Sequence, residues 1–475
     1  MVLKVINHPF QYDMKNLCTV FFPYEKIREN GEEDIVVVTE RAGDILFVNA
    51  RVYDKEILRK HKINQNEDMA EAMSVLLYNA LIEIMGYEPP WGILFGVRPA
   101  KLMHRFCEQY GEQGARDYFI NNFLVKKQKA DLAIEVMKHE NEIISLSSEN
   151  SFSLYVSIPF CPSRCSYCSF VSHSIERTQK LMEPYTELLC RELEYTGEIA
   201  KALGLRLETV YFGGGTPTTL TPFQLEKLFR VIEKSFDLST LREYTVEAGR
   251  PDTVTEDKLN SLKGAGVSRI SINPQSFNDK VLKEIGRRHT SRETVKAFEM
   301  ARRIGFDNIN MDFIAGLPKD NIASFKVGID RAVDMNTESV TVHTLALKSA
   351  AYLVTRDLTF DLTDRIITAD MVDYSEKSLP SKGYYPYYMY RQSKSLGNLE
   401  NVGWCKPGRD CLYNVYMMDE THSVFAVGAG AVTRLKNQKT GHIERIYNHK
   451  YPYEYIDRFN EITERKNGIL SFYNE

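Results

Sequence analysis

The chain has 475 residues, 43% of them hydrophobic and 26% charged, and at roughly 150 residues per domain this length excludes a single small module. Its 60 Lys and Arg against 64 Asp and Glu give a formal net charge of −4, which offers no broad basic field for nucleic acid and no polybasic membrane anchor. The first residues lack the apolar core of a signal peptide, and no apolar run approaches the ~18 residues of a spanning helix, so we expect a cytoplasmic protein.

Residues 1–148 are predicted to form an N-terminal α+β accessory domain. The stretches DIVVVTE (34–40) and DILFVNARVYD (44–54) alternate as paired strands do. Helical periodicity follows from about Glu67 to Lys138. The polar run HENEIISLSSENS (139–151) has the composition of a linker to the next domain.

Residues 149–350 alternate β-rich runs with amphipathic stretches, a pattern typical of a parallel α/β sheet with right-handed crossovers. The expected strands are 153–159, 209–213, 244–249, 269–273, 308–314 and 339–345, and the expected helices are 180–203, 222–236, 292–304 and 324–335. Six strand–helix units fall short of a closed eight-fold barrel, so the sequence predicts a partial (β/α)6 barrel. Residues 351–475 are predicted to form a C-terminal α+β extension that covers the open side of the barrel and completes a substrate pocket.

Unusual residues follow the predicted strands. In parallel α/β folds the chemistry lies at the carboxyl ends of the strands. We expect three cysteines after the first strand, a glycine turn after the second and single polar or small residues at the ends of the later strands. These residues are Cys161, Cys165 and Cys168, then Gly213–Thr216, and then Glu247, Gln275, Asp312 and Ala346.

The spacing of Cys161, Cys165 and Cys168 is the strongest chemical signal, because the other five cysteines are scattered. Three thiolates on a short loop can hold three corners of a cubane iron–sulfur cluster and leave its fourth iron open to a small molecule. One alternative is a structural zinc site, but such sites close four ligands, usually as paired dyads, and no second dyad lies nearby. Buried apolar cysteines are the other alternative, and they would not explain the regular spacing.

These residues carry a family resemblance. The segment YVSIPFCPSRCSYCSF (155–170) resembles the cluster loop of radical S-adenosylmethionine (SAM) enzymes, in the branch of oxygen-independent coproporphyrinogen III oxidase. The N-terminal GVRPAKLMHR (96–105) and the later NLENVG (398–403) are similar to the HemZ-like subgroup. Further motifs of the branch follow in order: GGGTPT (213–218), VEAGRP (246–251), RISINPQSF (269–277), GRRHT (286–290) and NINMDFIAGLP (308–318).

The resemblance implies a [4Fe–4S] cluster on Cys161, Cys165 and Cys168, with SAM chelating its unique iron and yielding a 5′-deoxyadenosyl radical. It also implies two SAM molecules. Contacts to the first would come from Tyr155, Gly214, Glu247, which would accept from the ribose hydroxyls, and Val432. Contacts to the second would come from Tyr167, Gly215, Thr216, Gln275, Arg287, Asp312 and Ala346. Backbone N–H groups of the glycine turn would donate to SAM, although such a turn is also explained by tight geometry alone.

The implied activity is the oxidative decarboxylation of coproporphyrinogen III propionates to vinyl groups, in heme biosynthesis. The implied partners are a tetrapyrrole substrate and an electron donor such as flavodoxin or ferredoxin. Arg287, Arg288 and Arg391 are candidates to meet the substrate propionates. His289 resembles a histidine of the heme-handling relatives, and we assign it no catalytic role.

The match is incomplete at Phe170, where the oxidase carries a fourth cysteine. The heme-trafficking relative HemW lacks that cysteine too, but its tail differs from CLYNVYMM (411–418). A heme-binding delivery protein, a radical SAM heme methyltransferase and a heme-ring-opening enzyme therefore stay open as alternative functions.

Overall fold

The computed structural model describes residues 1–96, 98–169, 172–347 and 360–474. By its contacts the chain divides into two compact units. Unit 1 comprises Met1–Met137, Asp357–Asp370 and Met389–Asn401, and unit 2 comprises Lys138–Arg356, Met371–Tyr388 and Val402–Glu475. The C-terminal third thus contributes chain to both units, and the three functional domains drawn from the sequence stay a prediction.

Unit 1 is built on a four-stranded sheet with helices packed against it. The sheet runs β1-β2-β3-β4, with β1 parallel to β2 and the other pairs antiparallel. The predicted pairing of two strands is confirmed by β2 and β3, whereas β1, β4 and α1 were not anticipated. The bounds are β1 Val2–Ile6, β2 Ile35–Ala42, β3 Ile45–Val52, β4 Lys55–Lys62, α1 Gln11–Phe21, α2 Met69–Met85 and α3 Pro99–Asn121.

The chain is helical where a linker was expected. The helix α4 runs from Lys127 to Ile144, so the linker prediction is wrong for residues 139–144. In this stretch Glu142 is exposed, while Glu140 and the apolar Ile143 are buried. Polar composition alone did not distinguish this stretch of helix from a loop.

Unit 2 contains an eleven-stranded sheet in the order β13-β14-β12-β11-β10-β9-β8-β5-β15-β16-β17. The six strands from β5 to β12 are parallel neighbours and correspond to the six predicted strands, so the partial barrel of six strand–helix units is confirmed. Their bounds are β5 Ser151–Ile158, β8 Arg206–Gly214, β9 Glu243–Glu247, β10 Arg269–Ser271, β11 Ile309–Ala315 and β12 Ser339–Thr344.

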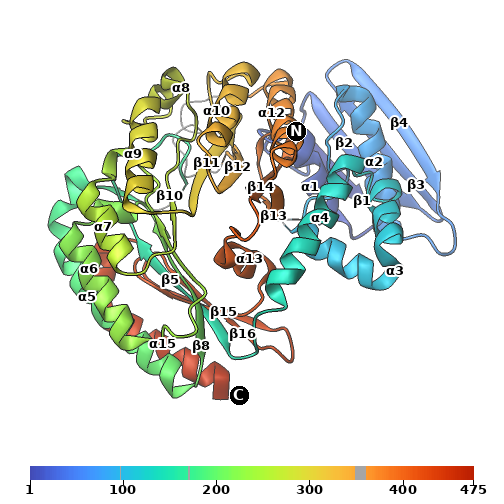
Figure 1. Ribbon diagram of the computed structural model, residues 1–475. Helices are drawn as coiled ribbons and strands as arrows, with labels where there is room; N and C mark the ends of the chain where they lie inside the picture. Colours follow the sequence, from blue (N-terminus) through green and yellow to red (C-terminus); the bar gives the residue numbers. More distant parts are fainter. Residues whose placement is uncertain (97, 170–171, 348–359, 475) are drawn as a thin grey trace. The chain divides into compact units, whose positions relative to one another are not determined.

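Helices cover the outer face of this sheet (Figure 1). Helix α6 begins at a capping box of Thr221 with Gln224, and α9 at one of Thr290 with Glu293, and both boxes satisfy backbone donors at the helix start. The bounds of the helices from α5 to α10 are α5 Ile175–Ala202, α6 Pro222–Ser235, α7 Glu256–Gly264, α8 Asp279–Glu284, α9 Ser291–Ile304 and α10 Ile322–Asp334. The later helices, not all of which lie on this face, are α12 Leu362–Ser381, α13 Leu412–Asp419, α14 Pro452–Asp457 and α15 Phe459–Asn474.

The two faces of the parallel sheet differ in chemistry because successive strand residues point to opposite sides. On β8, Phe212 packs on Phe229 of helix α6, while the ring of Tyr211 lies over Tyr155 of β5. The outward residues are apolar, and the inward set carries polar groups. The inward set includes Ser153, Tyr155, Thr209, Tyr211, Thr245, Glu247, Arg269, Ser271, Asn310, Asp312, Thr341 and His343. The interior of the barrel is therefore suited to a polar ligand.

The C-terminal region extends the sheet at both edges, an arrangement the sequence did not indicate, and its covering of the open side of the barrel stays a prediction. Strand β14 pairs antiparallel with β12, and β15 pairs parallel with β5. Helix α13 sends a ring onto the inward face, where Tyr413 stacks on Tyr211 at 4.4 Å between ring centroids. The bounds are β13 Tyr385–Arg391, β14 Glu400–Cys405, β15 Ser423–Val427, β16 Val432–Lys436 and β17 Ile443–Tyr447.

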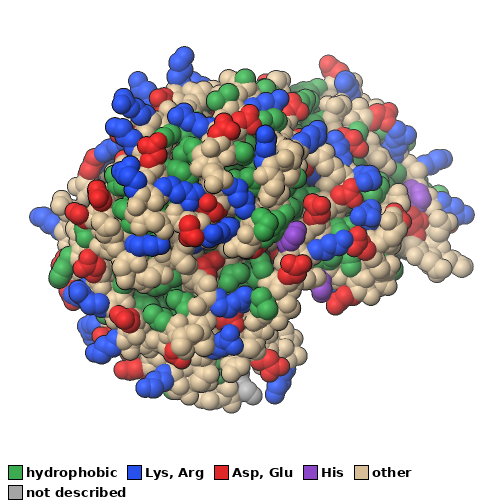
Figure 2. Space-filling model, viewed as in Figure 1, with side chains coloured by type: hydrophobic (Ala, Val, Ile, Leu, Met, Phe, Trp, Pro, Cys, Tyr) green, Lys and Arg blue, Asp and Glu red, His purple; other side chains and the backbone are tan. Residues whose placement is uncertain are grey.

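The distribution of surface charge and the composition of the helices agree with the near-neutral net charge and the absence of long apolar runs in the sequence. Figure 2 shows basic and acidic side chains interspersed over the visible face. None of the helices in the described ranges combines the length and the apolar composition that crossing a membrane requires.

Candidate functional site

The three cysteines lie on one loop at the carboxyl end of β5. Cys161 ends the two-residue strand β6 (Phe160–Cys161), which pairs with β7 (His173–Ser174). A tight turn follows, in which the backbone N–H of Cys168 donates to the carbonyl oxygen of Cys165 at 3.2 Å. The loop is tied to the far side of the barrel by Ser166, whose N–H donates to the carbonyl of Ile285 at 3.0 Å. Phe170 lies outside the described residues.

The glycine turn packs directly against the start of this loop. The N–H of Gly215 donates to the carbonyl of Ile158 and the N–H of Thr216 to that of Phe160, each at 2.7 Å. These two N–H groups of the turn therefore hold the cysteine loop, and the expectation that the backbone of Gly213–Thr216 donates to SAM stays a prediction for the rest of the turn. Gly214 has φ +106°, a conformation that side chains disfavour. The hydroxyl of Thr216 lies 3.4 Å from the sulfur of Cys161.

This close packing predicts the effect of Gly215→Ala. A Cβ at this position would lie 2.6 Å from the carbonyl oxygen of Phe160 and 2.9 Å from that of Ile158. Backbone must move to relieve the clash, and a displacement of about 1 Å at a reacting site costs about 10²-fold in rate. We expect turnover to fall by about that factor. Gly264→Ala is the control, since no atom lies within 4 Å of the position that its new methyl group would take; equal rates for both variants would contradict the close fit.

Glu247 ends β9 beside the glycine turn. Its Oε1 accepts from the hydroxyl of Tyr211 at 2.7 Å, and a Cβ on Gly213 would lie 3.1 Å from the same oxygen. Burial raises the pKa of Glu247 to about 7, against the opposing effect of the Tyr211 hydrogen bond. Tyr155 stacks on Tyr211 with 6.2 Å between ring centroids. The structure thus brings together Tyr155, Gly213 and Glu247.

Asp312 lies in the middle of β11 and not at its end, which corrects its predicted position. Its carboxylate accepts from the side-chain amides of Asn273 and Asn310, each at 2.6 Å. Burial alone would raise its pKa, but hydrogen bonding from His343 and Asn310 outweighs burial and holds that pKa below its ordinary value. Asp312 is therefore a fixed negative charge on the inward face.

Gln275 is bound to the same strand by its backbone. Its N–H donates to the carbonyl of Asp312 at 2.9 Å, and its own carbonyl accepts from Ile314 at 3.1 Å. Gln275 lies four residues beyond β10 with φ +64°, in the left-handed region that few non-glycine residues occupy. Such strain often accompanies functional positions.

Arg287 and Tyr167 also meet. The Arg287 guanidinium donates to the Tyr167 hydroxyl at 2.9 Å and to the carbonyl of Gly249 at 3.2 Å. Burial raises the pKa of Tyr167 above its ordinary value, opposed by Arg287.

The other two expected SAM contacts, Ala346 and Val432, lie near opposite ends of the row of parallel strands. Ala346 lies two residues beyond β12, and Val432 is the first residue of β16.

All three arginines expected to meet propionates have partners within the protein, and those of Arg391 and Arg288 differ from those of Arg287. Arg391 is buried in unit 1, where it donates to the carbonyls of Leu94 and Asn398 and lies over the ring of Trp91. It therefore stabilises that unit, and the hypothesis of a propionate contact is wrong for it. Arg288 forms an exposed ion pair with Glu176 at 2.7 Å, which a ligand can exchange at little cost.

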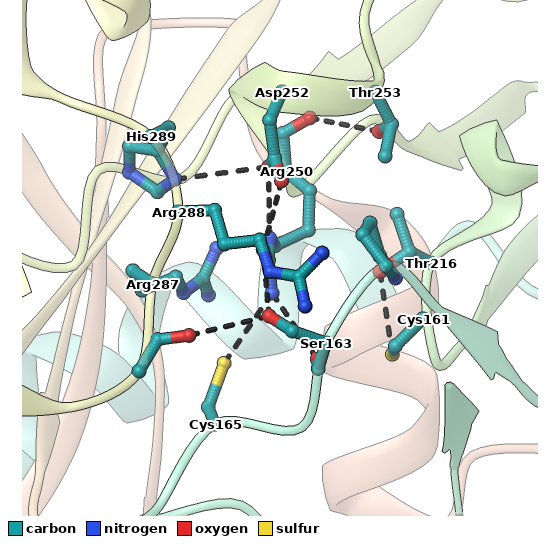
Figure 3. Close-up of polar contacts among 12 residues, drawn as sticks. Cys161, Ser163, Cys165, Thr216, Arg250, Asp252, Thr253, Arg287, Arg288 and His289 are labelled. Atoms are coloured by element: carbon teal, nitrogen blue, oxygen red, sulfur yellow. Dashed lines mark hydrogen bonds and ion pairs between the residues drawn. The ribbon is translucent and has the colours of Figure 1, made fainter. Parts of the chain in front are cut away.

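Sequence reasoning missed two residues beside the cluster loop, Arg250 and Asp252 (Figure 3). Both follow Glu247 within a few residues, and the VEAGRP motif includes Arg250, yet only Glu247 drew an assignment. The Arg250 guanidinium donates to the sulfur of Cys165 at 3.6 Å. The spacing of motifs in the sequence does not indicate this contact, because Arg250 and Cys165 lie on loops 85 residues apart in the chain.

The donor set at the rim fits an anionic sulfur cluster. All eight cysteines are thiols, and the sulfurs of Cys161 and Cys165 each face a polar partner, Thr216 and Arg250. Hydrogen bonds to sulfur are a common feature of iron–sulfur sites. Across the described residues, no three His, Cys, Asp or Glu side chains, the three cysteines included, gather as the ligands of one metal ion do.

Comparison with known proteins gives three findings. The radical SAM superfamily matches residues 155–331. The oxygen-independent coproporphyrinogen-III oxidase-like protein HemZ of Bacillus subtilis is 33% identical over 470 residues, which cover 95% of this chain and 94% of that protein. The heme chaperone HemW of Bacillus subtilis is 34% identical over 287 residues, which cover 59% of this chain and 70% of that protein.

A solved structure supports the fold. The coproporphyrinogen III oxidase HemN of Escherichia coli, a radical SAM enzyme, aligns with 80% of this chain and 78% of its own, with a TM-score of 0.53 and 20% sequence identity. At this identity the likeness concerns the fold alone. It agrees with the partial barrel of six strand–helix units described above.

Proposed function

Because this chain belongs to the HemZ-like branch of the radical SAM proteins, we propose that it catalyses the oxidative decarboxylation of coproporphyrinogen III propionates to vinyl groups. The observation that carries the proposal is the meeting of the cysteine loop, the glycine turn and Glu247 at one rim. This rim belongs to a chain similar along 95% of its length to an oxidase-like relative. A tetrapyrrole is accordingly the proposed substrate, and a flavodoxin or ferredoxin the proposed electron donor.

The proposed cofactors are a [4Fe–4S] cluster on Cys161, Cys165 and Cys168 and one or two SAM molecules. When bound, the reduced cluster would give one electron to SAM and so supply a 5′-deoxyadenosyl radical, which would take a hydrogen atom from a propionate β-carbon. CO2 would then leave, and an external electron acceptor would take the remaining electron to give the vinyl group. The protein's own contribution is to bind and orient. Thr216 and Arg250 hold two of the thiols in place.

The inward carboxylates complete the proposed binding site. The Glu247 carboxylate would accept from ribose hydroxyls, and Asp312 would hold a cationic ammonium group. Arg287, fixed by Tyr167 and Gly249, presents a guanidinium to a carboxylate. Each of these assignments is a proposal that follows the resemblance of the motifs.

The proposal is tested by anaerobic incubation of the reconstituted protein with a reductant, SAM and coproporphyrinogen III, followed by mass spectrometry of the tetrapyrrole. We expect a product that has lost CO2 and gained vinyl groups. A tetrapyrrole of unchanged mass in the presence of an intact cluster would contradict it.

The second candidate is heme delivery. Two observations favour it: the similarity to HemW over 287 residues, and phenylalanine in place of a fourth cysteine at position 170. Titration with heme distinguishes the two functions. Stoichiometric heme binding without decarboxylation would favour delivery, and weak heme binding with decarboxylation would favour the oxidase.

The pKa of Glu247 makes a prediction about SAM binding. Because this pKa is raised to about 7, the side chain carries a proton below pH ~7 and becomes a carboxylate, the stronger acceptor, as the pH rises through that value. We expect SAM affinity, measured by calorimetry, to increase between about pH 6 and 8. In Glu247→Gln the pH dependence should disappear and binding should be about tenfold weaker at the upper pH, the scale of one charged hydrogen bond. A variant that keeps the pH dependence would exclude Glu247 as its source.

A further inference from the structure

Arg250 occupies a central position among the polar contacts around the cysteine loop (Figure 3). Its side chain is 4% exposed. The Nε and Nη2 groups donate to the two oxygens of Asp252, each at 2.9 Å, as a two-pronged ion pair. One carboxylate therefore neutralises this buried guanidinium, and the remaining N–H directions face the cysteine loop.

The other hydrogen bonds of the Arg250 side chain all go to that loop. Nη1 donates to the sulfur of Cys165 at 3.6 Å and to the carbonyl of Ser163 at 3.3 Å, and Nη2 donates to the hydroxyl of Ser163 at 3.1 Å. Ser163 in turn donates to the carbonyl of Gly286 at 3.2 Å. The loop after β9, the cysteine loop and the loop after α8 are thus joined through two side chains, Arg250 and Ser163.

This geometry requires arginine. A planar fork with five donors can bind a carboxylate on one edge and a carbonyl, a hydroxyl and a sulfur on the other. A lysine ammonium would keep the charge, but its three donors on a flexible stem cannot reach all of these partners together. Side-chain length and planarity are therefore used here in addition to charge.

We propose that Arg250 is a positioning residue that fixes the cysteine loop and, through its N–H bond to the Cys165 sulfur, raises the reduction potential of the cluster bound there. A positive donor at a cysteine sulfur stabilises the more negative, reduced form of a cluster. The inference rests on the proposed function, because that function supplies the cluster. It concerns a residue that neither the motif resemblance nor the comparisons assign.

The test compares Arg250→Gln, Arg250→Lys and Arg288→Gln with the wild type. Arg288 lies two residues beyond Gly286 and its pairing with Glu176 is exposed, so Arg288→Gln removes one nearby charge without touching the loop. After anaerobic reconstitution, three quantities are measured without substrate. They are the iron and sulfide content, the thermal unfolding, and the fraction of reduced cluster, determined by electron paramagnetic resonance at fixed solution redox potentials.

We expect Arg250→Gln to lower the ratio of reduced to oxidised cluster about tenfold at a given solution potential. This corresponds to a reduction potential lower by about 59 mV for a one-electron couple. Arg250→Lys should fall between Arg250→Gln and the wild type, and Arg288→Gln should match the wild type. A lower iron content in Arg250→Gln with unchanged thermal unfolding would equally support the positioning role.

Two results would overturn the inference. One is a potential and an iron content in Arg250→Gln equal to those of Arg288→Gln. The other is loss of cooperative unfolding in both Arg250 variants, which would assign Arg250 to general stability. Because no substrate is present, a wild type that holds the cluster but leaves coproporphyrinogen III unchanged would count against the proposed function and not against Arg250.

Discussion

Cys165→Ala is expected to abolish the bound cluster and to lower turnover by at least about 10³-fold, the scale of removing an essential catalytic group. Cys165 has the most enclosed thiol of the three, at 8% exposed, and its sulfur faces the Arg250 guanidinium. Two remaining thiolates leave one corner of the cluster without a protein ligand. Alanine also leaves the buried Arg250 donor without its sulfur partner. Iron content, visible absorbance and 5′-deoxyadenosine formation measure the effect.

Cys107→Ala is the matched control. Cys107 is a half-buried thiol on α3 in unit 1, so its removal takes one sulfur from the chain and none from the rim. The control should reconstitute as the wild type does. If Cys165→Ala took up as much iron as the wild type and showed the same absorbance, the cluster assignment would be wrong.

Glu192→Gln is expected to cost about 3–5 kcal/mol of unfolding free energy, the cost of breaking a buried ion pair by removing one partner. Glu192 and Lys466 are 0% and 1% exposed and lie 3.1 Å apart. The same carboxylate accepts from the N–H of Gly428 at 2.8 Å and the hydroxyl of Tyr455 at 2.6 Å. It thereby anchors the turn between β15 and β16 that leads to Val432.

Urea denaturation of two further variants tests whether the broken buried ion pair causes this loss of unfolding free energy. Glu187→Gln on the same helix breaks an exposed pair with Lys227, and such pairs contribute about 0–1 kcal/mol. Combining Lys466→Met with Glu192→Gln should cost less than Glu192→Gln alone, because no uncompensated charge then remains buried and the glutamine amide oxygen still accepts from the donors that bind Glu192. Equal losses from Glu192→Gln and Glu187→Gln would show that the buried pair is not the source.

The parallel sheet could be predicted because its physics is local. The parallel strands are short runs rich in β-branched residues, such as SVTVHTL (339–345), and the intervening helices have a clear apolar periodicity. The position of the cysteine loop followed from the rule that loops after the strands meet at one rim. The pairing of Arg287 with Tyr167, by contrast, needs the folded arrangement of two loops 120 residues apart.

What the sequence did not reveal depends on register and long-range contact. Asp312 was expected at a strand end, but β11 continues for three residues beyond it because Phe313 and Ile314 pair with β12. The N–H groups of Gly215 and Thr216 were expected to face a ligand, and only the packing of β8 against the cysteine loop reveals that they bind Ile158 and Phe160. A sheet edge gives no local signal of the strand that will join it, so the positions of β14 and β15 were also missed.

The account is tested most directly by counting products of one anaerobic reaction containing the reconstituted protein, reductant, SAM and coproporphyrinogen III. The proposed function predicts loss of two molecules of CO2 from each tetrapyrrole, with 5′-deoxyadenosine formed alongside, and neither product in Cys165→Ala. Formation of 5′-deoxyadenosine by the wild type with no CO2 released would contradict the oxidase function while leaving the radical SAM chemistry in place.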